Sequence, residues 1–312
     1  MAAQQLDGAD PASCGPGLSR YHPSAGRAAH LEAVRRPDQS IMPTRTHSPE
    51  TPPEVGEVLA DLLTRVRTIL DDQFVGLYLY GSLATGDFNP YQSDIDFIVV
   101  TASDLADQTI ADLESMHMQP VSSGKHWVTK LEGAYVPQHA LRRYDPHQPP
   151  VPTINEGQFY LGKQGSDWII QRHILREFGA SVAGPNIAGL IDPVQPDDLR
   201  ASIQAALAEW WKPMVEDPTR LERPEYQPYA VLSMCRALYT LEHGETVSKV
   251  DAASWAIREL NPKWKDLIHR AMGWRRGEPM GNIAATVEFM KYALAKAKRV
   301  RWRSTTSGRV GA

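Results

Sequence analysis

Two aspartates separated by one residue, Asp94 and Asp96, are the side chains of this chain best suited to chemistry. Residues two apart on an extended strand point to the same face, so the two carboxylates are expected side by side. Like charges this close repel each other unless a divalent cation lies between them. Oxygen ligands suit Mg²⁺, which completes its octahedron with water and substrate phosphates. The pair therefore predicts a Mg²⁺ and phosphate site, with Asp94 and Asp96 as catalytic metal ligands.

A glycine and a serine, Gly81 and Ser82, precede the aspartates and suit the binding of a phosphate chain. Glycine lets the backbone approach a triphosphate closely, and the serine hydroxyl can hydrogen-bond to its oxygens. Apolar strands are predicted over residues 74–80 and 97–100. A turn of small residues would follow the first strand, and the second strand would begin directly after the two carboxylates.

The stretch from Tyr80 to Val100 resembles the Gly-Ser, then Asp-x-Asp, signature of the polymerase-beta-type nucleotidyltransferases. Nucleotidyl transfer needs in-line attack on the α-phosphate of a nucleotide, with pyrophosphate leaving, so charge neutralisation and positioning supply most of the catalysis. A third carboxylate is then expected, either as a metal ligand or as the base for the attacking hydroxyl. Glu132, on a predicted strand over 126–136, is the candidate. From the residues alone, an exposed strand glutamate remains an alternative.

The longer stretch over residues 49–296 resembles the aminoglycoside adenylyltransferases that modify streptomycin and spectinomycin. This resemblance implies that Glu132 is the catalytic base and that Mg²⁺ assists the transfer of AMP from ATP. It also implies that Arg236 and Lys249 bind the ATP phosphates, and that the acceptor is a small cationic antibiotic. Spacing alone leaves other roles open, because Arg236 could pair with Glu242 and a lysine at a helix start is usually solvated.

The sequence departs from this family at two places where the antibiotic is held. A tryptophan of the family falls here near Phe159 and Tyr160, and an acidic residue falls near Glu225 and Tyr226. We expect Phe159 or Tyr160 to stack on a sugar, and Glu225 or the nearby Glu222 to pair with an amine or a guanidinium group. The identity of the antibiotic is therefore left open.

Composition narrows the possible partners. The chain has 312 residues, a formal net charge of -4 and a pI near 6.2, which disfavours nucleic acid as a partner. Its two cysteines, Cys14 and Cys235, suggest no disulfide framework, as expected in a reducing cytoplasm. No apolar run is long enough to cross a bilayer, so no membrane partner is expected.

The pattern of apolar residues predicts an α/β (α+β) protein of two domains. Residues 1–52 and 301–312 lack apolar periodicity and are expected to be a disordered leader and tail. A nucleotidyltransferase domain with a mixed sheet is predicted over 53–190, and a helical bundle over 191–300. Helical spacing occurs at 55–70, 105–118, 168–178, 197–215, 228–243, 249–260, 263–274 and 282–298, whereas 141–156 reads as an irregular crossing and 182–185 as a break.

The sequence leaves two other functions open. A nucleotidyltransferase of the toxin-antitoxin kind could transfer AMP to a tRNA or a protein with the same chemistry. A regulatory module could keep the fold and bind nucleotide without catalysis. The joint presence of Asp94, Asp96 and Glu132 argues against the regulatory module, because binding alone does not need three carboxylates.

Overall fold

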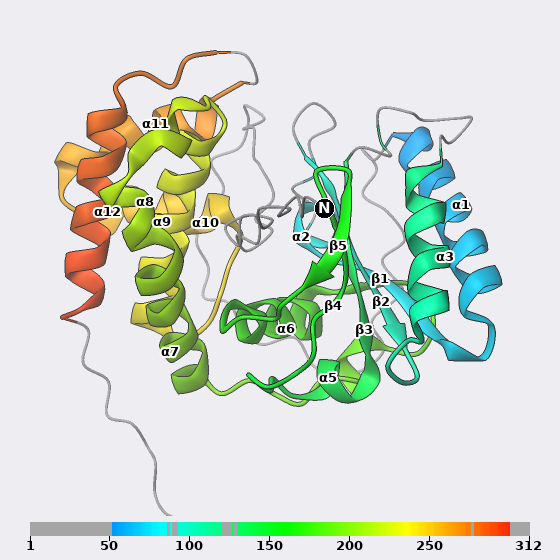
Figure 1. The fold of residues 1–312 in the computed structure, drawn as a ribbon. Helices are drawn as coiled ribbons and strands as arrows, with labels where there is room; N and C mark the ends of the chain where they lie inside the picture. Colours follow the sequence, from blue (N-terminus) through cyan, green and yellow to red (C-terminus); the bar gives the residue numbers. More distant parts are fainter. Residues whose placement is uncertain are drawn as a thin grey trace, which may run out of the picture.

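The computed structural model describes residues 52–299, apart from 86–87, 89–92, 120–126, 128–129 and 276–277. The expected leader, except Pro52, and the expected tail lie outside the described residues. Figure 1 shows a sheet between two helices on one side and a group of helices on the other. Within the described residues, no helix is both long and apolar enough to cross a membrane.

A mixed six-stranded sheet forms the centre of the first half of the chain, as predicted. The strands lie in the order β5-β4-β3-β2-β1-β6. Strands β2 and β3 are parallel, and every other neighbouring pair is antiparallel. Their bounds are β1 Phe74–Leu79, β2 Ile95–Thr101, β3 Leu131–Pro137, β4 Val151–Asn155, β5 Gln158–Gly162 and β6 Ala180–Ala183.

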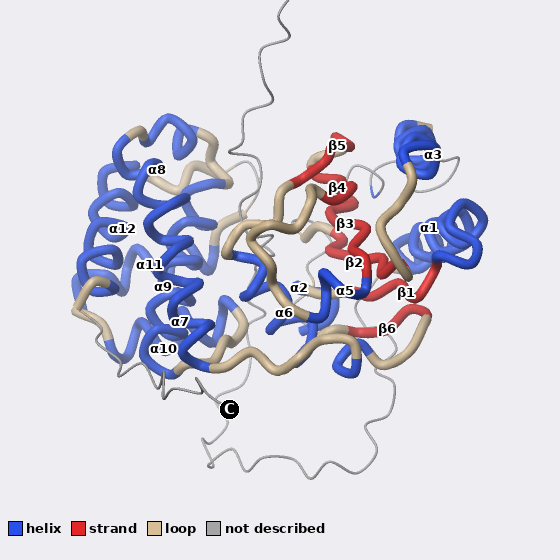
Figure 2. Tube along the Cα trace, turned by 60° about the horizontal axis from the view of Figure 1, so that its bottom comes forward, coloured by secondary structure: helices blue, strands red, loops and turns tan. Residues whose placement is uncertain are grey.

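One face of the sheet is covered by α1 (Pro53–Leu70) and α3 (Asp107–Met118). Helix α1 forms because its apolar residues recur at helical spacing, with proline at its first position, where no N–H is needed. Alternate strand residues such as Leu77 and Phe97 pack beneath these helices. Figure 2 shows both helices on the same side of the strands.

The opposite face of the sheet looks toward the remaining helices. Tyr78, Ile98 and Ala134 point to this side and join one continuous apolar core with the C-terminal helices. Two helices of the first half, α5 (Gln138–Arg142) and α6 (Asp167–Phe178), contribute to the same core. Any polar side chain on this face therefore lies between the sheet and the helical half.

The second half of the described chain is helical, as predicted. Its central helix, α9 (Tyr226–His243), packs against α7, α10, α11 and α12. Helix α9 ends at Gly244, whose φ of +74° favours glycine and closes the helix. The other helices are α7 Pro196–Ala206, α8 Lys212–Glu216, α10 Lys249–Glu259, α11 Lys265–Gly273 and α12 Ile283–Ala297.

Two segments that were expected to be irregular or broken contain strands. The stretch 141–156, expected to be irregular, contains β4, which pairs with β5 in a hairpin turning at Glu156 and Gly157. The expected break at 182–185 contains the end of β6, which pairs with the edge of β1. Both strands are short, and β6 pairs with β1, which lies far earlier in the chain, so local periodicity carries little sign of them.

The predicted helix over 197–215 is divided into α7, a π-helical turn η4 (Leu207–Trp211) and α8. Pro213 lies at the start of α8 and has no backbone N–H to continue the preceding turn. The wider π turn accommodates that loss.

Candidate active site

Three carboxylates meet where the central strands β2 and β3 begin, on the face of the sheet that looks toward the helical half. Strand β2 begins at Ile95, two residues earlier than predicted, because its parallel pairing with β3 already starts there. Asp96 therefore lies inside the strand, and Asp94 lies directly before it. Asp96 pairs in register with Glu132 of β3. Residues in register on parallel strands point to the same face, so Asp96 and Glu132 lie side by side.

Asp96 is the buried carboxylate of this group. It is 2% exposed, and burial, Glu132 and Asp94 together raise its pKa well above the usual range. Lys249 and Arg236 of the helical half act in the opposite direction and lower the pKa of Asp96. The two halves of the chain thus bring three acidic and two basic side chains together, which are the groups predicted from the sequence.

Gly81 and Ser82 begin a short helix, α2 (Gly81–Thr85), rather than the predicted turn. Gly81 has a φ of +62°, and a Cβ atom there would lie 2.0 Å from Oδ2 of Asp96. Only glycine leaves room for this carboxylate. Ser82 is 1% exposed, and neither its Oγ nor Oδ2 of Asp96 has a hydrogen-bond partner among the residues that the structure describes. Two buried polar atoms without partners at one place indicate a site that a ligand completes.

These residues fit a Mg²⁺ ion and a phosphate chain. Among the described residues, no group of three or more His, Cys, Asp and Glu side chains has the arrangement of a complete metal cluster. Magnesium does not need one, because it takes several ligands from water and from substrate phosphates. The Asp94 and Asp96 carboxylates, one with a buried oxygen that lacks a partner, match that incomplete ligand set.

Lys130 is a neighbour of this centre that the sequence did not indicate. Its Nζ lies 3.0 Å from Oδ1 of Asp94, and the two side chains are 8% and 15% exposed. It had been expected inside a strand, but β3 begins only at Leu131, and Lys130 lies in the turn before it. Its backbone carbonyl accepts a hydrogen bond from the Ile95 N–H at 2.7 Å, which fixes the turn beside the aspartates.

Lys249 and Arg236 are held by the two helices that face the sheet. Lys249 is the first residue of α10, and Ser248 caps this helix by accepting a hydrogen bond from the Asp251 N–H. Lys249 is 5% exposed and its Nζ lies 5.0 Å from the centre of the Tyr229 ring, so the alternative of a solvated lysine is wrong. Burial lowers the pKa of Arg236 to about 10, and it stays protonated at neutral pH.

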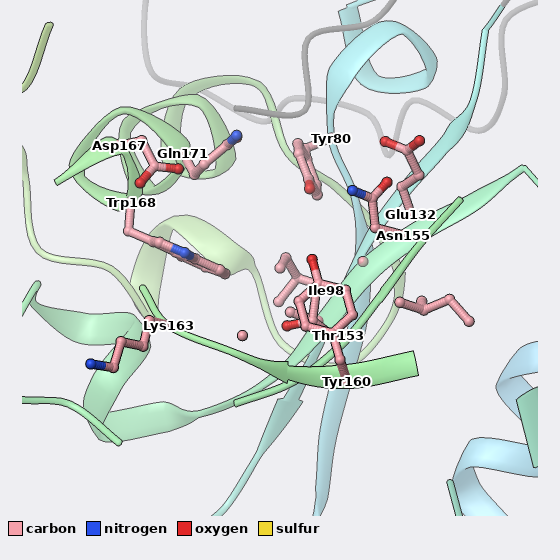
Figure 3. A pocket seen from close by; sticks show the side chains of 14 residues that line it. Tyr80, Ile98, Glu132, Thr153, Asn155, Tyr160, Lys163, Asp167, Trp168 and Gln171 are labelled. Carbon is pink, nitrogen blue, oxygen red and sulfur yellow. The ribbon is translucent and has the colours of Figure 1, made fainter. Parts of the chain in front are cut away.

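A pocket extends from Glu132 along the sheet toward α6 (Figure 3). It leaves about 620 Å³ of empty space, part of which is open solvent. The lining residues are Tyr80, Ile98, Glu132, Gly133, Ala134, Thr153, Ile154, Asn155, Tyr160, Gly162, Lys163, Asp167, Trp168 and Gln171. Glu132 thus belongs both to the carboxylate group and to the pocket.

Of the four residues expected to hold the antibiotic, only Tyr160 lines this pocket. Phe159 points to the other face of the sheet, where its ring stacks on His117 with 5.7 Å between centroids. Phe159 and Tyr160 are successive residues of β5, and successive side chains of a strand point to opposite faces of the sheet. Glu225 forms an ion pair with Arg223 at 2.8 Å, and Glu222 ends a 3₁₀ helix.

The chain matches two family models. Residues 62–126 match the model of a nucleotidyltransferase domain, and residues 189–296 match that of the C-terminal domain of aminoglycoside adenylyltransferase. The chain belongs to the aminoglycoside adenylyltransferase family. The resemblance seen in the sequence is thereby confirmed, and so is the predicted order of a mixed-sheet nucleotidyltransferase region before a helical one.

Two similar proteins of this family align over most of the chain. An aminoglycoside (3'') (9) adenylyltransferase of Escherichia coli is 24% identical over 79% of this chain and 96% of its own length. A spectinomycin 9-adenylyltransferase of Campylobacter jejuni is 24% identical over 80% of this chain and 98% of its own. The match with nearly their whole length shows that the family's two regions are both present here.

A solved structure has the same fold. The spectinomycin adenyltransferase of Enterococcus faecalis, crystallised with ATP and spectinomycin, superposes with a TM-score of 0.61 and 18% identity. The match covers 77% of this chain and 99% of that one. At this identity the superposition supports the fold of this family member.

Proposed function

We propose that this chain transfers AMP from ATP to a hydroxyl group of an aminoglycoside or aminocyclitol antibiotic. The observation that carries the proposal is the meeting of Asp94, Asp96 and Glu132 with Arg236 and Lys249. A buried acidic group facing two cations suits a reaction in which a triphosphate must be neutralised and a hydroxyl deprotonated.

The reaction divides among these residues. Asp94 and Asp96 would hold Mg²⁺, which supplies positive charge to the triphosphate. Arg236 and Lys249 would bind phosphate oxygens, and the buried Ser82 hydroxyl would donate a hydrogen bond to one of them. Glu132 would accept the proton of the acceptor hydroxyl. The new bond joins the hydroxyl oxygen to the α-phosphorus, and the bond from that phosphorus to pyrophosphate breaks.

A cationic acceptor suits the charge of this region. Glu132 and Asp167 line the pocket, and the relatives named above are adenylyltransferases of aminoglycosides and spectinomycin. Such antibiotics carry several amines, and these are protonated at neutral pH. Attraction between the acidic pocket and a cationic acceptor would bring a hydroxyl next to Glu132.

The test is to incubate the purified protein with labelled ATP and Mg²⁺ and to offer streptomycin, spectinomycin, other aminoglycosides, tRNA or protein in separate reactions. Pyrophosphate release and a labelled product that appear only with an antibiotic support the proposal. Labelling of tRNA or protein would move the function to the toxin-like class. Nucleotide binding without transfer to any acceptor would indicate a regulatory module.

A further inference from the structure

The pocket has a second polar end, opposite Glu132, whose side chains take no part in the bond-making step itself. It is formed by Asp167, Trp168 and Gln171 of α6 (Figure 3). Asp167 and Gln171 are four residues apart on this helix, so their side chains lie on the same face, one turn from each other. The figure shows both beside one another, with Glu132 and Asn155 across the pocket.

Gln171 offers a hydrogen-bond acceptor at the pocket wall. The residue is 6% exposed, and its Oε1 has no hydrogen-bond partner within the described part of the chain. A buried amide oxygen without a partner is disfavoured by desolvation, so its persistence at a pocket wall indicates that a ligand donates to it. The ligand must therefore carry an N–H or O–H group at this end.

Asp167 adds negative charge to the same end. Its carboxylate is largely screened from water, and Glu209 of the helical half adds a second negative charge nearby. The exposed Lys163 at the rim extends away from Asp167 (Figure 3). The Asp167 carboxylate beside the amide oxygen of Gln171 favours a ligand group that donates hydrogen bonds and carries a positive charge.

The ring of Trp168 reaches toward the middle of the pocket, below Asp167 and Gln171 (Figure 3). A half-buried indole face can pack against a saturated ring, and it also attracts a cation placed over it. The three neighbouring side chains of α6 therefore offer one aromatic face and two oxygen acceptors to the same ligand group. A phosphate would be repelled by Asp167.

We propose that Asp167, Gln171 and Trp168 form a subsite for a protonated amino group of the acceptor. This subsite rests on the proposed function and adds what holds the acceptor while its hydroxyl lies at Glu132. The ammonium group donates hydrogen bonds to the Asp167 carboxylate and to Oε1 of Gln171, and the carbon ring that carries it packs on Trp168. Recognition thus comes from the nucleotidyltransferase half of the chain.

The experiment compares Asp167→Asn and Gln171→Leu with the wild type. The matched controls are Asp112→Asn and Gln108→Leu, because this pair has the same spacing on α3 but is exposed, with a hydrogen bond of 2.9 Å between its side chains. Calorimetry measures binding of 2-deoxystreptamine, a cyclitol with two amines, of its N,N'-diacetyl derivative, and of Mg²⁺-ATP. AMP transfer to the accepted antibiotic gives KM and kcat, and thermal unfolding checks the fold.

We expect Asp167→Asn to weaken 2-deoxystreptamine binding and to raise the antibiotic KM by about tenfold or more, since it removes a charge-assisted hydrogen bond. Gln171→Leu should weaken 2-deoxystreptamine binding by about threefold to tenfold. Binding of Mg²⁺-ATP, and the weak binding of the diacetyl derivative, should change less than about twofold. The two control variants should match the wild type.

Unchanged amine binding in both α6 variants overturns the subsite. So does a loss of ATP affinity with acceptor affinity intact, since that would place the adenine of ATP against Gln171. If Asp167→Asn transfers AMP to the antibiotic like the wild type, the subsite is wrong and the proposed function stands. If no antibiotic is modified but 2-deoxystreptamine binds in a manner that depends on Asp167, the subsite stands and the proposed function is wrong. If neither occurs, both are wrong.

Discussion

Asp96 of β2 and Glu132 of β3 are in register on parallel strands, so both carboxylates emerge from the same face of the sheet. That face looks toward α9 and α10, which carry Arg236 and Lys249. The strand register thereby sets two acidic groups next to each other, and packing of the helical half brings the cations to them.

Asp94→Asn and Asp96→Asn should each abolish measurable AMP transfer while leaving the protein folded. Each change removes a negative oxygen ligand without changing the shape of the side chain. Pyrophosphate release at saturating Mg²⁺ measures the effect, and thermal unfolding checks the fold. The exposed Asp112→Asn serves as control. Near wild-type release in either variant would contradict the assignment of the metal ligands.

Arg236→Ala and Lys249→Ala should each weaken ATP binding by about tenfold to a hundredfold. Lys249 is buried and Arg236 is half-buried, and both act on the buried Asp96, so each would meet the triphosphate charges with reduced solvent screening. Calorimetry with Mg²⁺ present measures the affinity. Arg258→Ala, which removes an exposed cation from the same helix as Lys249, should have no effect. Equal affinities in all three variants would return Arg236 and Lys249 to a structural role.

Asp167→Asn should stabilise the fold at pH 8 but not at pH 4. Burial, and to a lesser extent Glu209, raise the pKa of Asp167 to about 6, so the ionised form is disfavoured in the folded state. The penalty is absent below the unfolded pKa and is complete above pH 6. After allowance for solvent screening, its removal is worth about 1–2 kcal/mol, or a few degrees in Tm.

Thermal unfolding of the wild type and Asp167→Asn between pH 4 and pH 8 checks this sign. Tyr80, Tyr144 and Tyr229 also face Asp167, but burial raises the pKa of each, so none of them ionises in this range. A variant that is less stable than the wild type at pH 8 would show that the Asp167 carboxylate has a stabilising partner in the fold.

Lys130→Met should destabilise the protein in the absence of divalent ions, and Mg²⁺ should restore part of the loss. The change removes the ammonium group that lies 3.0 Å from the Asp94 carboxylate, and it leaves that carboxylate without its cation. The pair is mostly buried, so about 1–3 kcal/mol is expected. A divalent cation at Asp94 would replace the missing charge.

The control for Lys130→Met is Lys263→Met, which breaks an exposed ion pair with Glu288 of similar length, 2.9 Å. Thermal unfolding with and without Mg²⁺ measures both variants, and the control should lose little stability and gain nothing from Mg²⁺. Equal behaviour of the two variants would remove Lys130 from the metal site.

Much of this site could be predicted because its signals are local. Asp94 and Asp96 are two residues apart, and the strands around them have strong apolar patterns, so their shared face follows from the sequence. The roles of Glu132, Arg236 and Lys249 came from the family resemblance. Their meeting depends on strand register and helix packing, which residue spacing does not reveal.

The residues that sequence reasoning missed depend on tertiary placement. Lys130 approaches Asp94 from the turn before β3, at a position where the sequence predicted a strand. The spacing of Asp167 and Gln171 predicts one shared helix face, but the same spacing occurs at the exposed pair on α3. What distinguishes Asp167 and Gln171 is the strand hairpin across from them, and one of its strands lay in the segment expected to be irregular.

The central claim is that Glu132 accepts the proton of the acceptor hydroxyl beside the two aspartates. The most direct test is Glu132→Gln, which keeps the size of the side chain but cannot take up that proton at neutral pH. Single-turnover transfer of labelled AMP should slow by roughly 10²–10⁴-fold, the usual contribution of a general base, while calorimetry finds ATP affinity unchanged. Transfer at the wild-type rate in this variant would contradict the account and leave only the aspartate pair in the mechanism.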